Sequence, residues 1–193
     1  MAPDVAVRPS EVHVPRPLIP HPGPPPSTTT NRNHARIICE IANAQKLGKW
    51  EERCETWMHE IYVRCVFGVK IYDITTSLGT AQRAMIAKLW TRQALEGSVL
   101  STNATLATAG VRVKTWDFGT MQFNTLTPTA CTGANLPTYQ VTIPISDVFW
   151  NPPIVNGIVN EAGYTPTVPN EVVDNNFVID LYGIQRWVQN AQK

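Results

Sequence analysis

Cysteine and histidine are the side chains that come closest to a catalytic arrangement in this sequence. Cys54, His59 and Cys65 lie close together in the chain. On a helix, the five residues from Cys54 to His59 turn through about 500°, which points the imidazole away from the thiols. Cys131 stands in the stretch T-A-C-T-G, a loop that could expose a nucleophile if a distant histidine served as its base. No nearby residue supports this, so a small cysteine-dependent enzyme with an interface site is kept only as an alternative.

The same residues give a poor metal-binding pattern. The spacings between Cys39, Cys54, His59 and Cys65 are 15, 5 and 6 residues, unlike the close cysteine pairs of structural zinc sites. The sequence also contains no phosphate-binding loop, dinucleotide fingerprint, zinc-protease motif or nucleophile elbow. We therefore expect no catalysis, no metal and no cofactor. The cysteines are expected to be reduced and to pack as small apolar side chains.

The stretch from residue 50 to 66 shows the clearest secondary-structure pattern. Its apolar residues recur every three or four positions, which places them on one face of a helix. These residues are Trp50, Cys54, Trp57, Ile61 and Cys65. A helix with such a stripe must bury it against another element.

Two further helices are predicted beside it, over residues 34–47 and 81–96. Each has apolar residues at helical spacing and a glycine that could end it, Gly48 and Gly97. The short link at Gly48 favours an antiparallel pairing of the first two helices. Residues 66–74 are predicted to leave the helix and form a short strand.

After about residue 100 the sequence becomes rich in Thr, Asn, Pro and Val, and apolar residues alternate with polar ones. Asn156-Gly157 between two apolar pairs is a strong hairpin signal. A short helix is expected at the C-terminal end, and the segments 119–137 and 160–175 are expected to be long loops. The predicted strands lie near residues 111–114, 141–145, 154–159 and 177–181.

These patterns predict an α+β fold. We divide the chain into an extended Pro-rich arm (1–32), a three-helix block (33–98) and an antiparallel β-rich module with a short C-terminal helix (99–193).

The arm holds nine of the sixteen prolines. Such a segment favours extended polyproline II conformation and stays disordered unless something holds it. We expect that a neighbouring subunit holds it, and the alternative is that the arm folds back on its own domain.

Ten residues are predicted to bind partners. Those in the arm are Pro15, Arg16, Pro17, Pro24, Pro25 and Pro26. The others form an aromatic pair before a rigid corner, namely Phe149, Trp150, Pro152 and Pro153. For such an aromatic pair, packing inside its own domain is the commoner outcome. The prolines could instead recruit an SH3- or WW-type partner, which would make the chain an adaptor module.

The charge pattern favours self-association. The net charge is +1, with no basic stripe, which argues against nucleic acid as the main partner. Residues 1–114 carry 14 basic and 9 acidic side chains, whereas residues 115–193 carry 2 basic and 6 acidic ones. Copies of such a chain could attract one another head to tail. No apolar stretch is long enough to suggest a membrane partner.

We therefore predict a non-catalytic structural subunit of a large symmetric assembly. An arm held in place by a neighbour, a bipolar charge and Thr/Asn/Pro-rich loops are together typical of proteins of virus or phage particles. The candidate roles are capsid, connector, tail and cement protein. The expected location is the virion, assembled in the host cytoplasm. The expected partners are copies of the chain and other structural subunits, with no small-molecule substrate.

Overall fold

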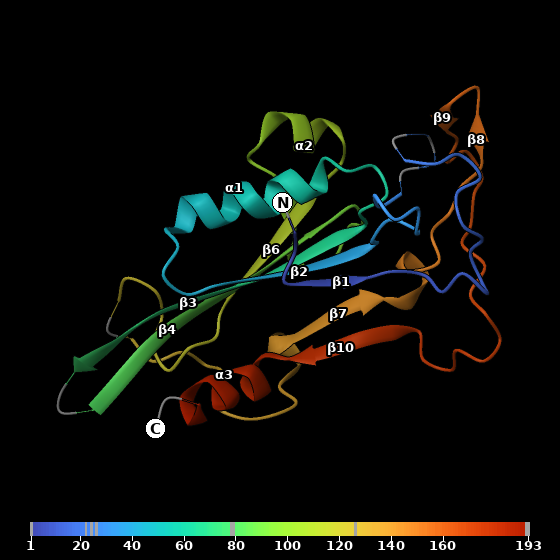
Figure 1. Cartoon of the computed structure of the whole chain (residues 1–193). Coiled ribbons are helices and arrows are strands. Elements are labelled where there is room, and N and C mark those ends of the chain that lie inside the picture. The colour runs from blue at the N-terminus through green and yellow to red at the C-terminus, as the bar shows by residue number, and fades with distance from the viewer. Residues whose placement is uncertain are drawn as a thin grey trace.

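The computed structural model describes residues 2–21, 23, 25, 27–77, 80–125 and 127–191. They form a mixed α and β structure built around one large sheet, in agreement with an α+β class (Figure 1). The strands of the large sheet are β1 (Val5–Val7), β2 (Ile37–Ala42), β3 (Cys65–Ser77), β4 (Thr80–Thr91), β5 (Val99–Leu100) and β6 (Arg112–Asp117). The remaining strands are β7 (Gln140–Pro144), β8 (Ile154–Val155), β9 (Ile158–Val159) and β10 (Asn176–Asp180). The α-helices are α1 (Leu47–Met58), α2 (Ala104–Thr108) and α3 (Leu181–Asn190), and single 3-10 turns span Pro137–Tyr139 and Ile145–Asp147.

The six strands of the large sheet follow the order β1-β2-β3-β4-β6-β5. Strands β2 and β3 are parallel, and all other neighbours are antiparallel. Parallel neighbours need a crossover connection, which α1 supplies here. Strands β3 and β4 extend beyond their neighbours at the lower left of Figure 1.

Helix α1 covers one face of the sheet. Trp50, Cys54 and Met58 are buried there against β2, β3 and β4. The predicted stripe is therefore correct up to Met58 and wrong beyond it, because Ile61 is exposed and Cys65 begins β3.

The C-terminal end of α1 is stabilised by a side chain from a distant part of the chain. The guanidinium of Arg92, just after β4, donates hydrogen bonds to the carbonyls of Met58 (2.7 Å) and Val63 (3.1 Å). A cation at a helix C-terminus stabilises carbonyls that have no partner within the helix.

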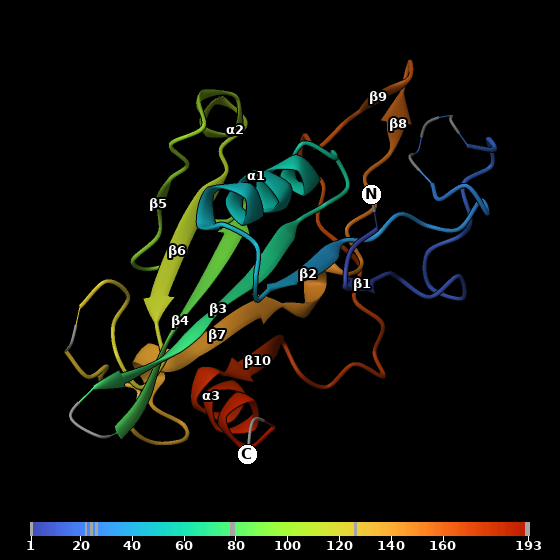
Figure 2. The same ribbon diagram turned by 60° about the vertical axis from the view of Figure 1, so that its left-hand side comes forward.

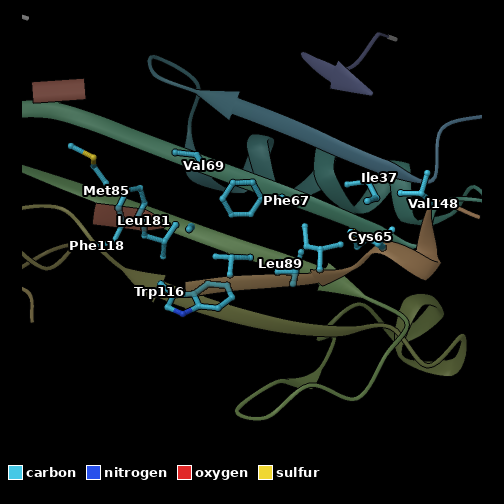
Figure 3. Packing of buried hydrophobic residues seen from close by; sticks show 14 of the residues in the cluster. Ile37, Cys65, Phe67, Val69, Met85, Leu89, Trp116, Phe118, Val148 and Leu181 are labelled. Carbon is cyan, nitrogen blue, oxygen red and sulfur yellow. The ribbon is translucent and has the colours of Figure 1, made fainter. Parts of the chain in front are cut away.

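The opposite face is covered by the β7–β10 ribbon and α3. In β7, Val141 and Ile143 point toward the sheet, and Leu181 of α3 packs beside them. Figure 3 shows the side chains of this core, among them Phe67 from β3 and Leu89 from β4. The sheet is therefore the middle layer between two apolar cores.

The predicted three-helix block is wrong. Residues 34–47 contain strand β2, and residues 81–91 belong to strand β4, so the predicted antiparallel pairing of the first two helices is not formed. Ile37 and Ile38 point to opposite faces of β2, yet both are buried, one in each core. A strand buried on both faces reads as a continuous apolar run, which periodicity alone cannot distinguish from a helix.

Several other predicted elements are confirmed. Strands β6, β7 and β10 and helix α3 lie where the sequence placed them, and the predicted strand over residues 66–74 lies within the longer β3. The β8–β9 hairpin turns at Asn156 and Gly157, whose φ angles are 52° and 77°. Positive φ at both central residues is typical of the tight hairpin turn that Asn-Gly favours.

The arm packs on its own domain. Strand β1 pairs with β2, and Asp4 accepts a hydrogen bond from the backbone N–H of Ile41 (2.7 Å). The backbone N–H of Arg36 donates to the carbonyl of Val7 (2.9 Å). In the isolated chain the arm is therefore a strand followed by turns, and not a free polyproline helix.

The three predicted segments share one sheet. The arm contributes β1, the segment 33–98 contributes β2, β3 and β4, and the segment 99–193 contributes β5 and β6. Within the described residues, no helix is both long and apolar enough to cross a membrane.

Candidate partner-binding surface

A groove lies where the arm meets the corner that follows Trp150. It has a volume of about 490 Å³ and is lined mainly by apolar side chains. We call it the proline groove. Its arm side consists of Pro15, Arg16, Pro17, Leu18, Ile19 and Pro25. Its corner side consists of Tyr62, Asn151, Pro152, Pro153, Ile154 and Gly157.

The arm side is held by contacts just before the groove. Val14 is buried, and its carbonyl accepts a hydrogen bond from the side-chain amide of Asn33 (2.7 Å). The ring of His13 meets Phe149 edge to face at 6.0 Å. Arg16 forms an ion pair with Glu11 at the surface. These contacts order a segment whose proline content would otherwise leave it extended and solvated.

The corner side is held from beneath by Trp150. Its indole meets the rings of Tyr62 and Tyr164 edge to face, at 5.2 and 6.4 Å. Its carbonyl accepts a hydrogen bond from the Nε of Arg36 (2.7 Å), and the guanidinium of Arg64 stacks on its ring at 4.2 Å. The part of the groove formed by Pro152 and Pro153 is therefore supported by packed aromatic rings and two guanidinium groups.

The structure brings together six of the ten predicted partner-binding residues. Pro15, Arg16, Pro17, Pro25, Pro152 and Pro153 all line the proline groove. Phe149 and Trp150 are buried beneath it, which is the arrangement that the sequence left open as an alternative. Pro24 and Pro26 lie outside the described residues.

Sequence reasoning missed the apolar rim of the groove. Leu18 is 96% exposed and Ile19 is 51% exposed, and Ile158 on the nearby β8–β9 hairpin is 71% exposed. The sequence signal that could have identified this rim is the pair of aliphatic residues between Pro17 and Pro20. Large aliphatic side chains in a solvated arm indicate a contact site.

A buried acid supports the corner. Asp147 is 3% exposed, accepts a hydrogen bond from the side-chain amide of Gln93 (3.0 Å), and lies 3.9 Å from the Nε of Arg64. Burial raises the pKa of Asp147 above its usual 3.8, and Arg64 and Gln93 oppose that shift. Burial likewise lowers the pKa of Arg64.

The raised pKa of Asp147 predicts how stability changes with pH. Asp147 binds a proton more tightly in the folded chain than in the unfolded chain. Its contribution to the free energy of unfolding is therefore largest below pH 3.8, and it is lost as pH rises through the pKa of the folded state. Asp147→Asn should remove this pH dependence of stability. The change in the free energy of unfolding that it removes is about 1.4 kcal/mol for each unit by which the folded and unfolded pKa values differ. Urea unfolding of both proteins between about pH 3 and 7 measures it. A wild type that gains stability over Asp147→Asn as pH rises would mean that the Arg64 ion pair outweighs desolvation.

The cysteines are poorly placed for nucleophilic chemistry. All four thiols are free, and three of them, Cys54, Cys65 and Cys131, are buried. Burial raises the pKa of Cys131 to about 11, with a contribution from Asp180, and it also raises the pKa of Cys39 to about 11. A thiol with so high a pKa is almost entirely protonated at neutral pH, whereas the thiolate is the nucleophile. Within the described residues, no group of three or more His, Cys, Asp or Glu side chains could hold a metal ion.

Comparison with known proteins gives no relative. No protein-family model, no curated protein and no solved structure matches the chain.

Proposed function

We propose that this chain is a non-catalytic structural subunit of a large symmetric assembly, and that the proline groove is where it binds neighbouring subunits. The observation that carries the proposal is the cluster of exposed aliphatic side chains on the groove rim. Leu18, Ile19 and Ile158 stand in solvent beside a concave apolar surface. Exposed apolar groups around a hollow are typical of protein–protein contact sites.

The contacts of the arm support this proposal energetically. Association costs free energy when a mobile segment must be ordered at the interface. Here, Val14 and His13 already attach the arm to the chain's own core. The arm would thus act as one wall of a preformed site. The neighbouring subunit that the composition of the arm led us to expect is not required to order it.

We further propose that the assembly is a virus or phage particle. The support for this step is the sequence texture: a Pro-rich arm, and loops over residues 119–137 and 160–175 rich in Thr, Asn and Pro. Capsid, connector, tail and cement proteins remain the candidate roles.

Light scattering after size exclusion, over a dilution series, tests the proposal. The full chain should form a defined oligomer or polymer, and Ile19→Glu should reduce it to the mass of one chain, 21.4 kDa. A charged side chain on an apolar rim must be desolvated on association, which opposes binding. Substitution is preferred to deletion of the arm, because deletion would also remove β1 and buried Val14.

The matched control is Val173→Glu. Val173 is 89% exposed in the loop 160–175 and does not line the proline groove. It should leave the mass of the oligomer unchanged. A wild-type chain that stays monomeric at every concentration would overturn the proposal and favour an adaptor that recruits a different protein.

A further inference from the structure

Trp187 on α3 is the largest exposed apolar side chain in the described part of the chain. It is 75% exposed, whereas Leu181, Gln185 and Val188 of the same helix are buried. Among the described residues, no side-chain atom lies within 4 Å of the position that a Cβ would take at Gly183, one turn before Trp187. The indole therefore does not pack against that turn of the helix.

Helix α3, which carries this indole, is itself held firmly. The carboxylate of Asp180 caps the helix by accepting a hydrogen bond from the N–H of Tyr182 (3.0 Å). The buried amide of Gln185 donates to the carbonyls of Phe118 (2.6 Å) and Gly119 (2.9 Å). An aromatic anchor on a rigid element loses little conformational entropy when it binds.

Trp187 and the proline groove lie at opposite ends of the molecule. In Figures 1 and 2, α3 lies at the bottom, whereas the β8–β9 hairpin beside the groove lies at the upper right. The indole therefore cannot fill the groove of its own chain, and only a second molecule can bring the two together.

The chemistry of the two surfaces is complementary. Proline-rich surfaces bind aromatic side chains well, because the rigid rings pack flat against a π face at low entropic cost. In the groove, Pro15, Pro153 and Ile19 offer such contacts. A volume of about 490 Å³ is ample for one aromatic side chain.

The parts of the chain that carry the arm and α3 have opposite net charges, +5 for residues 1–114 (14 basic and 9 acidic side chains) and −4 for residues 115–193 (2 basic and 6 acidic side chains). On the arm, Arg8 and Arg32 are exposed and have no ion-pair partner among the described residues. Helix α3 belongs to the acidic part of the chain, and the residue that caps its N-terminus is the acid Asp180. Opposite potentials orient two copies as they meet.

We propose that Trp187 of one copy inserts into the proline groove of the next, which joins copies head to tail. This inference rests on the proposed function and names its partner, a second copy of the same chain. Because the two surfaces differ, the contact is heterologous, and repeating it generates a ring or an open filament.

Mixing two complementary variants tests the contact. Trp187→Ala keeps an intact groove, and Ile19→Glu keeps an intact indole. Each variant alone should have the mass of one chain, whereas an equimolar mixture should give a species of twice that mass and nothing larger. Trp187→Phe should retain part of the assembly. Far-UV circular dichroism and the urea midpoint of each single variant should match those of the wild type.

The outcomes separate the two proposals. If the wild type assembles and Trp187→Ala assembles equally well, the head-to-tail contact is wrong and the structural function stands. The same conclusion follows if both variants are monomeric but the mixture does not associate. If the wild type never assembles, both proposals are wrong.

Discussion

Trp50→Ala should lower the free energy of unfolding by about 3–5 kcal/mol, the usual cost of removing a large aromatic side chain from a core. Trp50 is 1% exposed, meets Trp90 edge to face at 5.7 Å, and occupies the space beside Gly68, where an added Cβ would lie 2.5 Å from its Cζ2. Alanine would leave a cavity between α1 and the sheet that the rigid strands could not fill. Urea unfolding measures the loss, and the midpoint should fall by about 2 M if the m-value is about 2 kcal/mol/M.

Two comparisons make this prediction specific. Trp50→Phe should cost less than alanine, because it keeps a ring in the core and removes an indole N–H that has no hydrogen-bond partner. Ile61→Ala should cost little, since Ile61 is 43% exposed although it shares the helical spacing of Trp50. Equal losses at Trp50 and Ile61 would mean that the helical stripe continues past Met58, against the structure.

Arg53→Met should cost about 3 kcal/mol at neutral pH, the lower end of the range for breaking a buried ion pair. The carboxylate of Glu40 is buried and lies 2.8 Å from the Nε of Arg53. It also accepts a hydrogen bond from the indole N–H of Trp57 (2.6 Å). Without the guanidinium, one N–H donor alone must stabilise a buried charge.

The pH dependence of this variant follows from the pKa of Glu40. Burial raises that pKa, whereas Trp57 and Arg53 lower it, so removing Arg53 should raise it further. The cost of Arg53→Met should therefore shrink as pH falls and Glu40 takes up a proton. Urea unfolding at two pH values measures the change.

A double variant isolates the buried charge. In Arg53→Met/Glu40→Gln, the glutamine is neutral and its carbonyl can still accept the hydrogen bond of Trp57. Most of the lost stability should return, because no charge is left unpaired. If it does not return, Arg53 acts mainly through packing and through its hydrogen bond to the carbonyl of Ala2 (2.9 Å).

Local patterns in the sequence predicted the elements whose environment is one-sided. The first three turns of α1 show a buried stripe on Trp50, Cys54 and Met58, and helical spacing identified them. Strand β7 alternates buried Val141 and Ile143 with exposed Thr142. The β8–β9 turn was predictable because Asn-Gly favours positive φ regardless of the rest of the chain.

Strands β2 and β4 were beyond such reasoning. In β4, Met85 and Leu89 belong to one core while Trp90 belongs to the other, so the apolar residues recur without the period of a strand. This apolar pattern is explained only by the elements that cover the two faces of the sheet. Those elements come from distant parts of the chain.

For the candidate site, the residue types could be predicted from the sequence, whereas their arrangement in space could not. The prolines of the arm and of the corner were evident as rigid binding groups from composition alone. Their meeting in one groove depends on long-range contacts, such as the hydrogen bond from Arg36 to the carbonyl of Trp150, which no local spacing encodes. Burial of Trp150 and exposure of Trp187 were likewise decided by packing, because a tryptophan is equally suited to a core and to an interface.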